Sequence, residues 1–410
     1  MKAPNSKFQN PKKLQISSSE SAARPRELEF EVWDFFGAWC LGFGVLALVT
    51  MTSDLRYAIR MLLKNRGFAD VAVFTLAVGI GASGSITHAQ PAQEISNLES
   101  GIEKLRTKWK IPGLVAGIAR NGRVVWTKGF GYADLEDRQP ATPDTVFHLA
   151  SLTKPFAAVV LLQLVETGQL DLDAPVEQFG VQLKADGIIR VRHLLTHTSE
   201  GTPGEIFRYS GNRFAELDKV LKGVTQKSFA QLVGERVLQP LGLTNTSPNP
   251  LNPAACAAAG RDADVFLQRS ARGYAFDGKT PADYPKHFVT AAGLVSTAGD
   301  VLRFSMALDG SQLLRPETRQ LAFTPARSPS GKVLPYGFGW FVQTRRGVKV
   351  LWHYGWDRAN ASLIIKVPER DAAFVLLANS EALSRKFDLG QDEDVTRSPF
   401  AREFLKTLRL

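Results

Sequence analysis

The spacing of apolar side chains after residue 90 changes from a helical to a strand-like pattern. From Ile95 to Lys110 apolar residues recur every three or four positions, which predicts an amphipathic helix. The stretches Gly113–Arg120 and Arg123–Phe130 are then typical of strands. The Asn-Gly dipeptide at 121–122 favours the positive φ angles of a two-residue hairpin turn, so we expect an antiparallel pair.

Three more strand-like runs lie near the end of the chain, and we expect them to complete the same sheet: Val348–His353, Ser362–Val367 and Ala373–Ala378. The segment from Lys154 to about Ala307 is mostly helical and loop-like, with helical spacing in Phe156–Val165 and Phe229–Leu238. The sequence therefore predicts an α/β fold of the α+β kind. It has a mainly antiparallel sheet flanked by helices, and a helical subdomain at roughly 155–307.

The first 90 residues form a predicted leader with two uncharged apolar runs, one from Phe35 to Met51 and one that starts at Val71. Counted from Met61, the pattern is that of a secretory signal, with a cleavage-like sequence at Thr87–Ala89. The alternative is two transmembrane helices with the basic stretch between them kept in the cytoplasm. Either interpretation exports the domain at 91–410. Cleavage or anchoring, and a start at Met1 or Met61, stay open.

A short part of this leader, Asp54–Ala82, resembles the start of an ABC-exporter-type permease. Such a permease needs several further membrane spans. No apolar run of 18 or more residues occurs after residue 100, so we interpret the segment as a borrowed or fused leader.

Composition and charge exclude several classes of protein. Hydrophobic residues make up 44% and charged residues 22% of the 410 residues, as in an ordinary globular protein. The net charge of +10 comes from scattered Lys and Arg residues without interleaved aromatics, so no nucleic-acid partner is expected. The two cysteines, Cys40 and Cys256, form no disulfide framework, and the six histidines show no zinc spacing. No cofactor and no metal is expected.

The candidate chemistry begins at Ser151, which is followed three residues later by Lys154 and then by an apolar helix-forming run. If a helix begins near Ser151, the two side chains share one face, so the Lys154 amine can reach the Ser151 hydroxyl. The helix start favours a developing alkoxide, and a lysine half-desolvated in a cleft has a lowered pKa and can act as a base. Taken alone the motif is weak, because Ser151 would also serve as a helix N-cap.

The residues around this motif resemble the β-lactamase-related serine hydrolases, which include class C β-lactamases, penicillin-binding proteins and esterases. The similarity extends along nearly all of residues 96–385. It rests on segments on both sides of Ser151: Gly129–Gly131, Asp144–Phe147, Leu170–Val176, Leu194–Ser199 and Gly293–Thr297. The resemblance implies an antiparallel sheet flanked by helices, a helical subdomain, and an active site between the two with Ser151 as the acylated nucleophile.

By the same resemblance, the family's second motif, a tyrosine followed two residues later by asparagine, falls at Tyr209. Tyr209 would then be catalytic, and a phenol beside an ammonium could work as a phenolate. The alternative is a tyrosine packed in the cleft wall. Gly211 stands where the family has asparagine, and Asn212, displaced by one position, is a substrate-binding candidate that reaches the cleft if the loop differs. The missing amide puts β-lactam hydrolysis in doubt.

The third family element resembles His353-Tyr354-Gly355. The resemblance implies that Gly355 lets a strand approach the substrate, and that the backbone amide of Trp356 joins that of Ser151 as an oxyanion hole. Histidine instead of lysine at 353 should weaken recognition of a substrate carboxylate, which favours neutral esters. The alternative for His353 is a buried strand histidine bonded to a backbone carbonyl. We expect His197 to satisfy backbone groups below the site.

The sequence thus predicts a serine hydrolase acting on a small ester, amide or β-lactam, with carboxylesterase-like activity slightly favoured. A penicillin-recognising sensor that acylates with little turnover is the alternative, and a permease fragment is a third. The membrane is expected as a partner only through an uncleaved leader. Substrate identity and oligomeric state stay open.

Overall fold

The computed structural model describes residues 93–410. The predicted apolar runs of the leader, its signal sequence, its permease-like segment and the domain boundary at residue 90 therefore lie outside the described residues. Within residues 93–410, no helix combines the length and apolar character that a membrane span requires.

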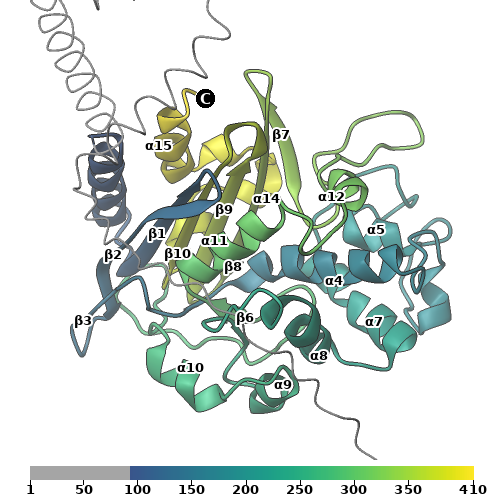
Figure 1. The fold of residues 1–410 in the computed structure, drawn as a ribbon, viewed down its shortest axis with the longest axis horizontal. Helices are drawn as coiled ribbons and strands as arrows, with labels where there is room; N and C mark the ends of the chain where they lie inside the picture. Colours follow the sequence, from purple (N-terminus) through teal and green to yellow (C-terminus); the bar gives the residue numbers. More distant parts are fainter. Residues whose placement is uncertain (1–92) are drawn as a thin grey trace, which may run out of the picture. The chain divides into compact units, whose positions relative to one another are not determined.

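A seven-stranded antiparallel sheet forms the centre of the fold, with the strand order β3-β2-β1-β10-β9-β8-β7 (Figure 1). Its strands are β1 (Gly113–Arg120), β2 (Arg123–Asp134), β3 (Gln139–Pro140), β7 (Phe341–Arg345), β8 (Val348–Asp357), β9 (Asn360–Val367) and β10 (Ala372–Ala378). The first and the last strands of the domain pair in the middle, because β1 lies beside β10. The predicted antiparallel sheet is confirmed.

The two faces of the sheet follow from the alternation of side chains along each strand. On β1, Leu114, Ala116 and Ile118 pack on one face with side chains of the helix at 93–108 and of α15 (Pro399–Thr407). Val115 and Ala119 belong to the core on the opposite face, where α11 (Ala298–Ala307) packs. Figure 1 shows α11 and α15 on opposite sides of the strands.

The segment between the outer parts of the sheet is largely helical. It contains α4 (Lys154–Glu166), α5 (Val191–Leu195), α6 (Gly211–Ala215), α7 (Leu217–Thr225), α8 (Phe229–Val233), a π-helical turn (Gly234–Leu238), α9 (Pro253–Ala258) and α10 (Ala263–Arg269). A small sheet of β4 (Phe147–His148), β6 (Leu294–Ser296) and β5 (Ser247–Pro248) lies at its base. Short 3₁₀ helices and α12 (Pro316–Ala322), α13 (Ala382–Arg385) and α14 (Leu389–Asp392) complete the domain.

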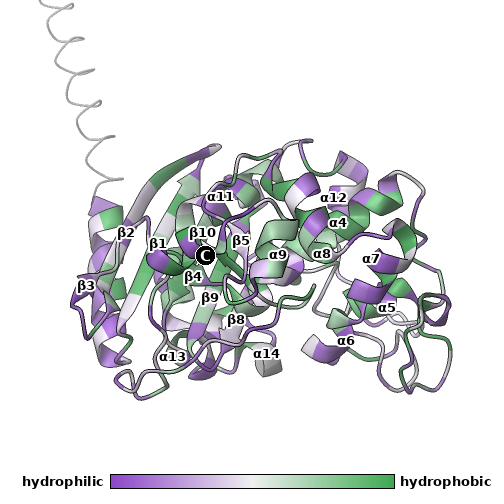
Figure 2. Ribbon diagram, turned by 90° about the horizontal axis from the view of Figure 1, so that it is seen from below, coloured by the Kyte–Doolittle hydropathy of each residue, from purple (hydrophilic) through white to green (hydrophobic). Residues whose placement is uncertain are grey.

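Helix α4 is almost entirely buried, which explains why its sequence is apolar on every side. Figure 2 shows α4 and the central strands coloured mainly as hydrophobic, whereas α5 and α7 carry polar residues. The residue that opens α4 is Lys154, a cation at the end of a buried apolar helix. Such a placement requires specific partners.

Candidate active site

Ser151 lies in a 3₁₀ turn, Ala150–Thr153, which leads directly into α4. A helix start near Ser151 was the condition for the two side chains to share one face; the 3₁₀ turn contains Ser151, and the α-helix itself begins at Lys154, with Pro155 in its first turn. A proline in the first turn costs no hydrogen bond, because the backbone N–H groups there have no partner within the helix, and its ring fixes a helical φ angle. Ala150, just before the serine, has a φ of 48°, which a residue with a Cβ atom rarely adopts. Strain of this kind is typical of functional turns.

Hydrogen bonds from β9 hold the backbone that leads to this turn. Ser362 Oγ donates to the Leu149 carbonyl at 2.7 Å, and Asn360 Nδ2 donates to the His148 carbonyl at 2.8 Å. Within the turn, Thr153 Oγ1 donates to the Ala150 carbonyl at 2.7 Å. These bonds are buried, so they fix the position of the nucleophile more firmly than exposed ones would.

Lys154 is fully buried, and its amine lies 2.9 Å from Ser151 Oγ. Its second partner is the carbonyl of Ala291, at 3.0 Å. The amine also lies 4.9 Å from the centre of the Tyr209 ring and 5.4 Å from that of Phe214. Burial lowers the pKa of Lys154 to about 7. A large fraction of Lys154 is therefore neutral near pH 7 and able to accept a proton.

The Tyr209 hydroxyl is shielded from solvent beside this pair, although the residue as a whole is half-buried. Burial raises the pKa of Tyr209 well above its usual range, Tyr354 adds to the rise, and the Ser151 side chain opposes it. The sequence interpretation allowed a phenolate, but the structure favours a neutral phenol, because the loss of water outweighs any help from a half-neutral lysine. Its oxygen makes no hydrogen bond of ordinary geometry within the described residues.

His197 packs against Tyr209, with ring centres 4.3 Å apart. Its Nδ1 accepts a hydrogen bond from the backbone amide of Ser210 at 3.2 Å. Burial lowers the pKa of His197 well below its usual range, so the ring is neutral. The contact with a backbone group agrees with the expected supporting position beneath the site.

His353 is fully buried, and both of its ring nitrogens are occupied. Nδ1 lies 2.7 Å from the Tyr354 carbonyl, which only accepts, so the proton sits on Nδ1. Nε2 then accepts from Tyr336 Oη at 2.8 Å. Burial lowers the pKa of His353 well below its usual range. This geometry matches the alternative of a strand histidine bonded to a carbonyl, and direct contact between His353 and substrate stays a prediction.

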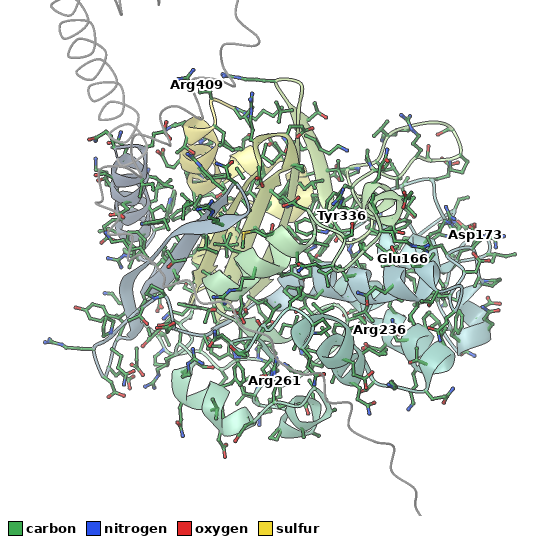
Figure 3. All side chains as sticks on the ribbon, in the orientation of Figure 1. Glu166, Asp173, Arg236, Arg261, Tyr336 and Arg409 are labelled. Atoms are coloured by element: carbon green, nitrogen blue, oxygen red, sulfur yellow. The ribbon has the colours of Figure 1, made fainter. Side chains whose placement is uncertain are left out.

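Tyr336 was not singled out in the sequence, because it lies in a loop without a motif. In Figure 3 it lies beside β7, near α12. Its hydroxyl donates to His353 Nε2 at 2.8 Å, and its ring packs edge-on against Phe341 with centres 4.8 Å apart. It therefore supports the strand that lines the site.

Gly355 brings β8 against the nucleophile turn. A Cβ atom at this position would lie 2.0 Å from the Leu149 carbonyl oxygen and 2.3 Å from Ser362 Oγ. The glycine is therefore required by the close approach of two backbones. Trp356 follows on the same strand, and its side chain is 48% exposed, with Nε1 donating to Glu381 at 2.9 Å. The oxyanion role of the Trp356 amide stays a prediction.

Asn212 is exposed in the first turn of α6 and makes no hydrogen bond within the described residues. Gly211 beside it faces open space, since no atom lies within 4 Å of a Cβ atom built there. The structure thus brings Ser151, Lys154, Tyr209 and Gly355 together, and it leaves Asn212 without a partner. Across residues 93–410, no group of three or more His, Cys, Asp or Glu side chains is placed to hold a metal ion.

Comparison with known proteins agrees with this fold. A family model described as Beta-lactamase matches residues 99–395. Penicillin-binding protein 4* of Bacillus subtilis (strain 168) is 23% identical over 337 residues, which cover 70% of this chain and 72% of that protein. Protein flp of Staphylococcus aureus (strain MW2) is 24% identical over 69% of this chain, which spans only 62% of that protein.

Among solved structures, the octameric penicillin-binding protein homologue from Pyrococcus abyssi has a TM-score of 0.64 at 24% identity, covering 76% of this chain and 77% of that one. Fold and site together define a serine hydrolase. The family match spans most of the described residues, and the chain belongs to the β-lactamase family. The resemblance inferred from the sequence is confirmed.

Proposed function

We propose that the protein hydrolyses neutral carboxylic esters through an acyl-enzyme on Ser151. The observation that carries this proposal is the 2.9 Å contact between Ser151 and a fully buried Lys154 whose pKa is lowered to about 7. A serine needs a base to attack a carbonyl at neutral pH, and this amine is placed to be that base.

In the acylation step, neutral Lys154 takes the proton of Ser151 Oγ as the oxygen attacks the ester carbonyl. The backbone amides of Ser151 and Trp356 are the proposed donors to the charge that develops on the carbonyl oxygen. As the C–O bond breaks, the Tyr209 phenol gives its proton to the leaving alkoxide. Lys154 then returns its proton to Tyr209, so that no net charge remains.

Deacylation uses the same groups in reverse. A water molecule gives its proton to neutral Lys154 as it attacks the acyl carbonyl. The bond to Ser151 Oγ then breaks, and the carboxylic acid product is released. Ser151 regains its proton from Lys154. Because a single amine accepts and returns the proton, ester hydrolysis needs no cofactor in this scheme.

The preference for neutral esters rests on two positions that resemble carboxylate- and amide-recognising positions in the family. His353 carries no permanent charge, and both its ring nitrogens are already bonded. Gly211 offers no side-chain amide. One such hydrogen bond contributes about 1 kcal/mol net, and more in a dry site. A substrate that depends on these contacts is therefore at a disadvantage.

A paired assay tests this preference. We expect the purified domain to hydrolyse a short-chain nitrophenyl ester with a kcat/KM at least about 30-fold above that for a chromogenic cephalosporin, which corresponds to two missing polar contacts of about 1 kcal/mol each. Gly211→Asn, which fits without a clash, should narrow this ratio. The reverse ratio would contradict the ester proposal. Acylation by the cephalosporin without turnover would instead favour the sensor.

The acylation rate is expected to depend on pH, with the midpoint of its rise on the acid side near pH 7. Only neutral Lys154 accepts the proton of Ser151, so the acylation rate should rise with pH through about 7 and level off above it. Stopped-flow acylation by the nitrophenyl ester measures this midpoint. Tyr209→Phe should lower the turnover of an alkyl ester, whose alkoxide needs a proton to leave, by roughly 10²-fold, and it should leave the midpoint for the nitrophenyl ester in place. A midpoint that moves with Tyr209→Phe would assign it to the tyrosine.

We also propose that the hydrolase domain acts outside the cytoplasm, either free or tethered by its leader. The support is the apolar run that begins at Val71, which precedes the domain. Fractionation of producing cells should recover esterase activity from the periplasm, the medium or the membrane. Activity found only in the cytosol, on a chain that still carries residues 61–89, would contradict export.

A further inference from the structure

A cavity of about 430 Å³ lies between α7, α8 and α9. None of the proposed catalytic residues lines it. One wall is apolar, because the rings of Phe229 and Phe288 stack with centres 5.1 Å apart and an interplanar angle of 6°. Alanines of α9 extend this wall. The volume is within the usual range of small-molecule sites, and the walls suit a planar apolar group.

The polar wall carries a carboxylate without a countercharge. Asp218 lines the cavity, and burial raises its pKa to about 7, with a further rise from Glu216. Lys222 also lines the cavity, but its amine donates to the Gln226 carbonyl at 2.6 Å. The other polar side chains of the wall are uncharged and belong to the N-cap residues of α8 and α9, Ser228 and Asn252. In the described part of the chain, no cation forms an ion pair with Asp218.

The same carboxylate is connected to the catalytic lysine. Asp218 Oδ1 accepts a hydrogen bond from the Thr290 amide at 3.1 Å, and Thr290 Oγ1 donates to the Phe214 carbonyl at 3.1 Å. The next residue, Ala291, supplies the carbonyl that accepts from Lys154 at 3.0 Å. The backbone from the Thr290 amide to the Ala291 carbonyl therefore links Asp218 to the amine of Lys154.

We propose that this cavity binds a small organic cation with a planar apolar group, and that the bound cation acts on Lys154 through Thr290 and Ala291. The ammonium pairs with Asp218, and the ring rests on Phe229 and Phe288. Pairing keeps the carboxylate ionised, which strengthens its hydrogen bond from Thr290. The Ala291 carbonyl is then held more firmly, and it stabilises the charged form of Lys154.

Binding is tested with 2-phenylethylammonium chloride on the Ser151→Ala protein, where no turnover interferes. We expect the melting temperature at pH 8 to rise by roughly 2 °C or more at saturating ligand. The neutral analogue 2-phenylethanol should give no such rise. At pH 5.5 the Asp218 carboxyl is mostly protonated, so affinity for the cation should be lower by roughly 10-fold or more.

Asp218→Asn provides the matched variant, because it keeps the shape of the side chain and removes its charge. The rise in melting temperature with 2-phenylethylammonium should disappear in this variant. A rise that survives Asp218→Asn would place the cation elsewhere, the active site included. An equal rise with 2-phenylethanol would show that the charge is not recognised. Either result overturns the site.

The coupling is tested on the protein with its serine intact, by the rate at which a fluorophosphonate labels Ser151. A rise of about half a unit in the pKa of Lys154 should slow labelling at pH 7 by roughly twofold in saturating 2-phenylethylammonium. The rate at pH 9, where Lys154 is already neutral, should not change. An unchanged rate at pH 7 overturns the coupling, and equal slowing at both pH values indicates competition at the active site. Neither readout requires ester turnover.

Discussion

Ser151→Ala is expected to abolish labelling by a fluorophosphonate and to lower ester turnover by roughly 10⁴-fold or more, since loss of an activated nucleophile removes the covalent route. Lys154→Met should leave the serine in place but slow labelling by roughly 10²-fold or more, because it removes the amine that contacts the serine hydroxyl at 2.9 Å. Methionine suits the buried position, which is filled by an unbranched side chain. Mass spectrometry locates the adduct.

The control is Ser210→Ala. Ser210 lies next to Tyr209 and is the N-cap of α6, because its Oγ accepts a hydrogen bond from the Arg213 backbone amide. Loss of this cap should cost about 1 kcal/mol of stability. Labelling of Ser151 should stay intact. An adduct on Ser199 or Ser210 in the parent protein would overturn the assignment. So would parent-like ester turnover by Ser151→Ala.

Gly355→Ala is the second substitution with a large expected effect. The added methyl group would lie 2.0 Å from the Leu149 carbonyl oxygen, so β8 or the nucleophile turn must shift. A displacement of about 1 Å at a reacting group costs roughly 10²-fold in rate. We expect kcat for a nitrophenyl ester to fall by that factor and the free energy of unfolding to fall by about 1–3 kcal/mol.

Gly299→Ala is the matched control, because the nearest atom to its added methyl group lies at 3.9 Å and the residue is helical. It should retain the parent kcat and stability. A kcat in Gly355→Ala equal to that of the parent would mean that β8 and the nucleophile turn can move apart without a loss of catalysis. The close approach of β8 would then have no part in catalysis.

The strands of the central sheet could be predicted where a buried run stands beside clear turn chemistry. β1 has the predicted bounds, and its hairpin turn has the expected positive φ angles of 51° at Asn121 and 66° at Gly122. β7 was missed, although its connection at Arg346 and Gly347 has φ angles of 49° and 77°. Arginine gives no turn signal, and only Phe341 in that strand is buried.

The residues of the site could be predicted where they form a motif of neighbouring positions in the sequence. They could not be predicted where residues far apart in the sequence come into contact in the fold. Ser151 and Lys154 lie one helical turn apart, so sequence spacing alone brings them together. Ala291 supplies a main-chain carbonyl, which any residue type would provide. Ser362 supports the turn from a strand more than 200 positions later, because its Oγ meets the Leu149 carbonyl. Such contacts depend on strand register, which no local pattern specifies.

The exposed side chain of Trp356 is a natural fluorescence probe of the active site. Trp340 and Trp352 are at most 1% exposed, whereas the indole of Trp356 is 48% exposed, one residue beyond the glycine that touches the nucleophile turn. An indole in water emits at longer wavelength than one in a dry core. A ligand that binds beside β8 and covers this indole should therefore shift its emission to the blue, so that the fluorescence of the unlabelled protein would report whether the site is occupied.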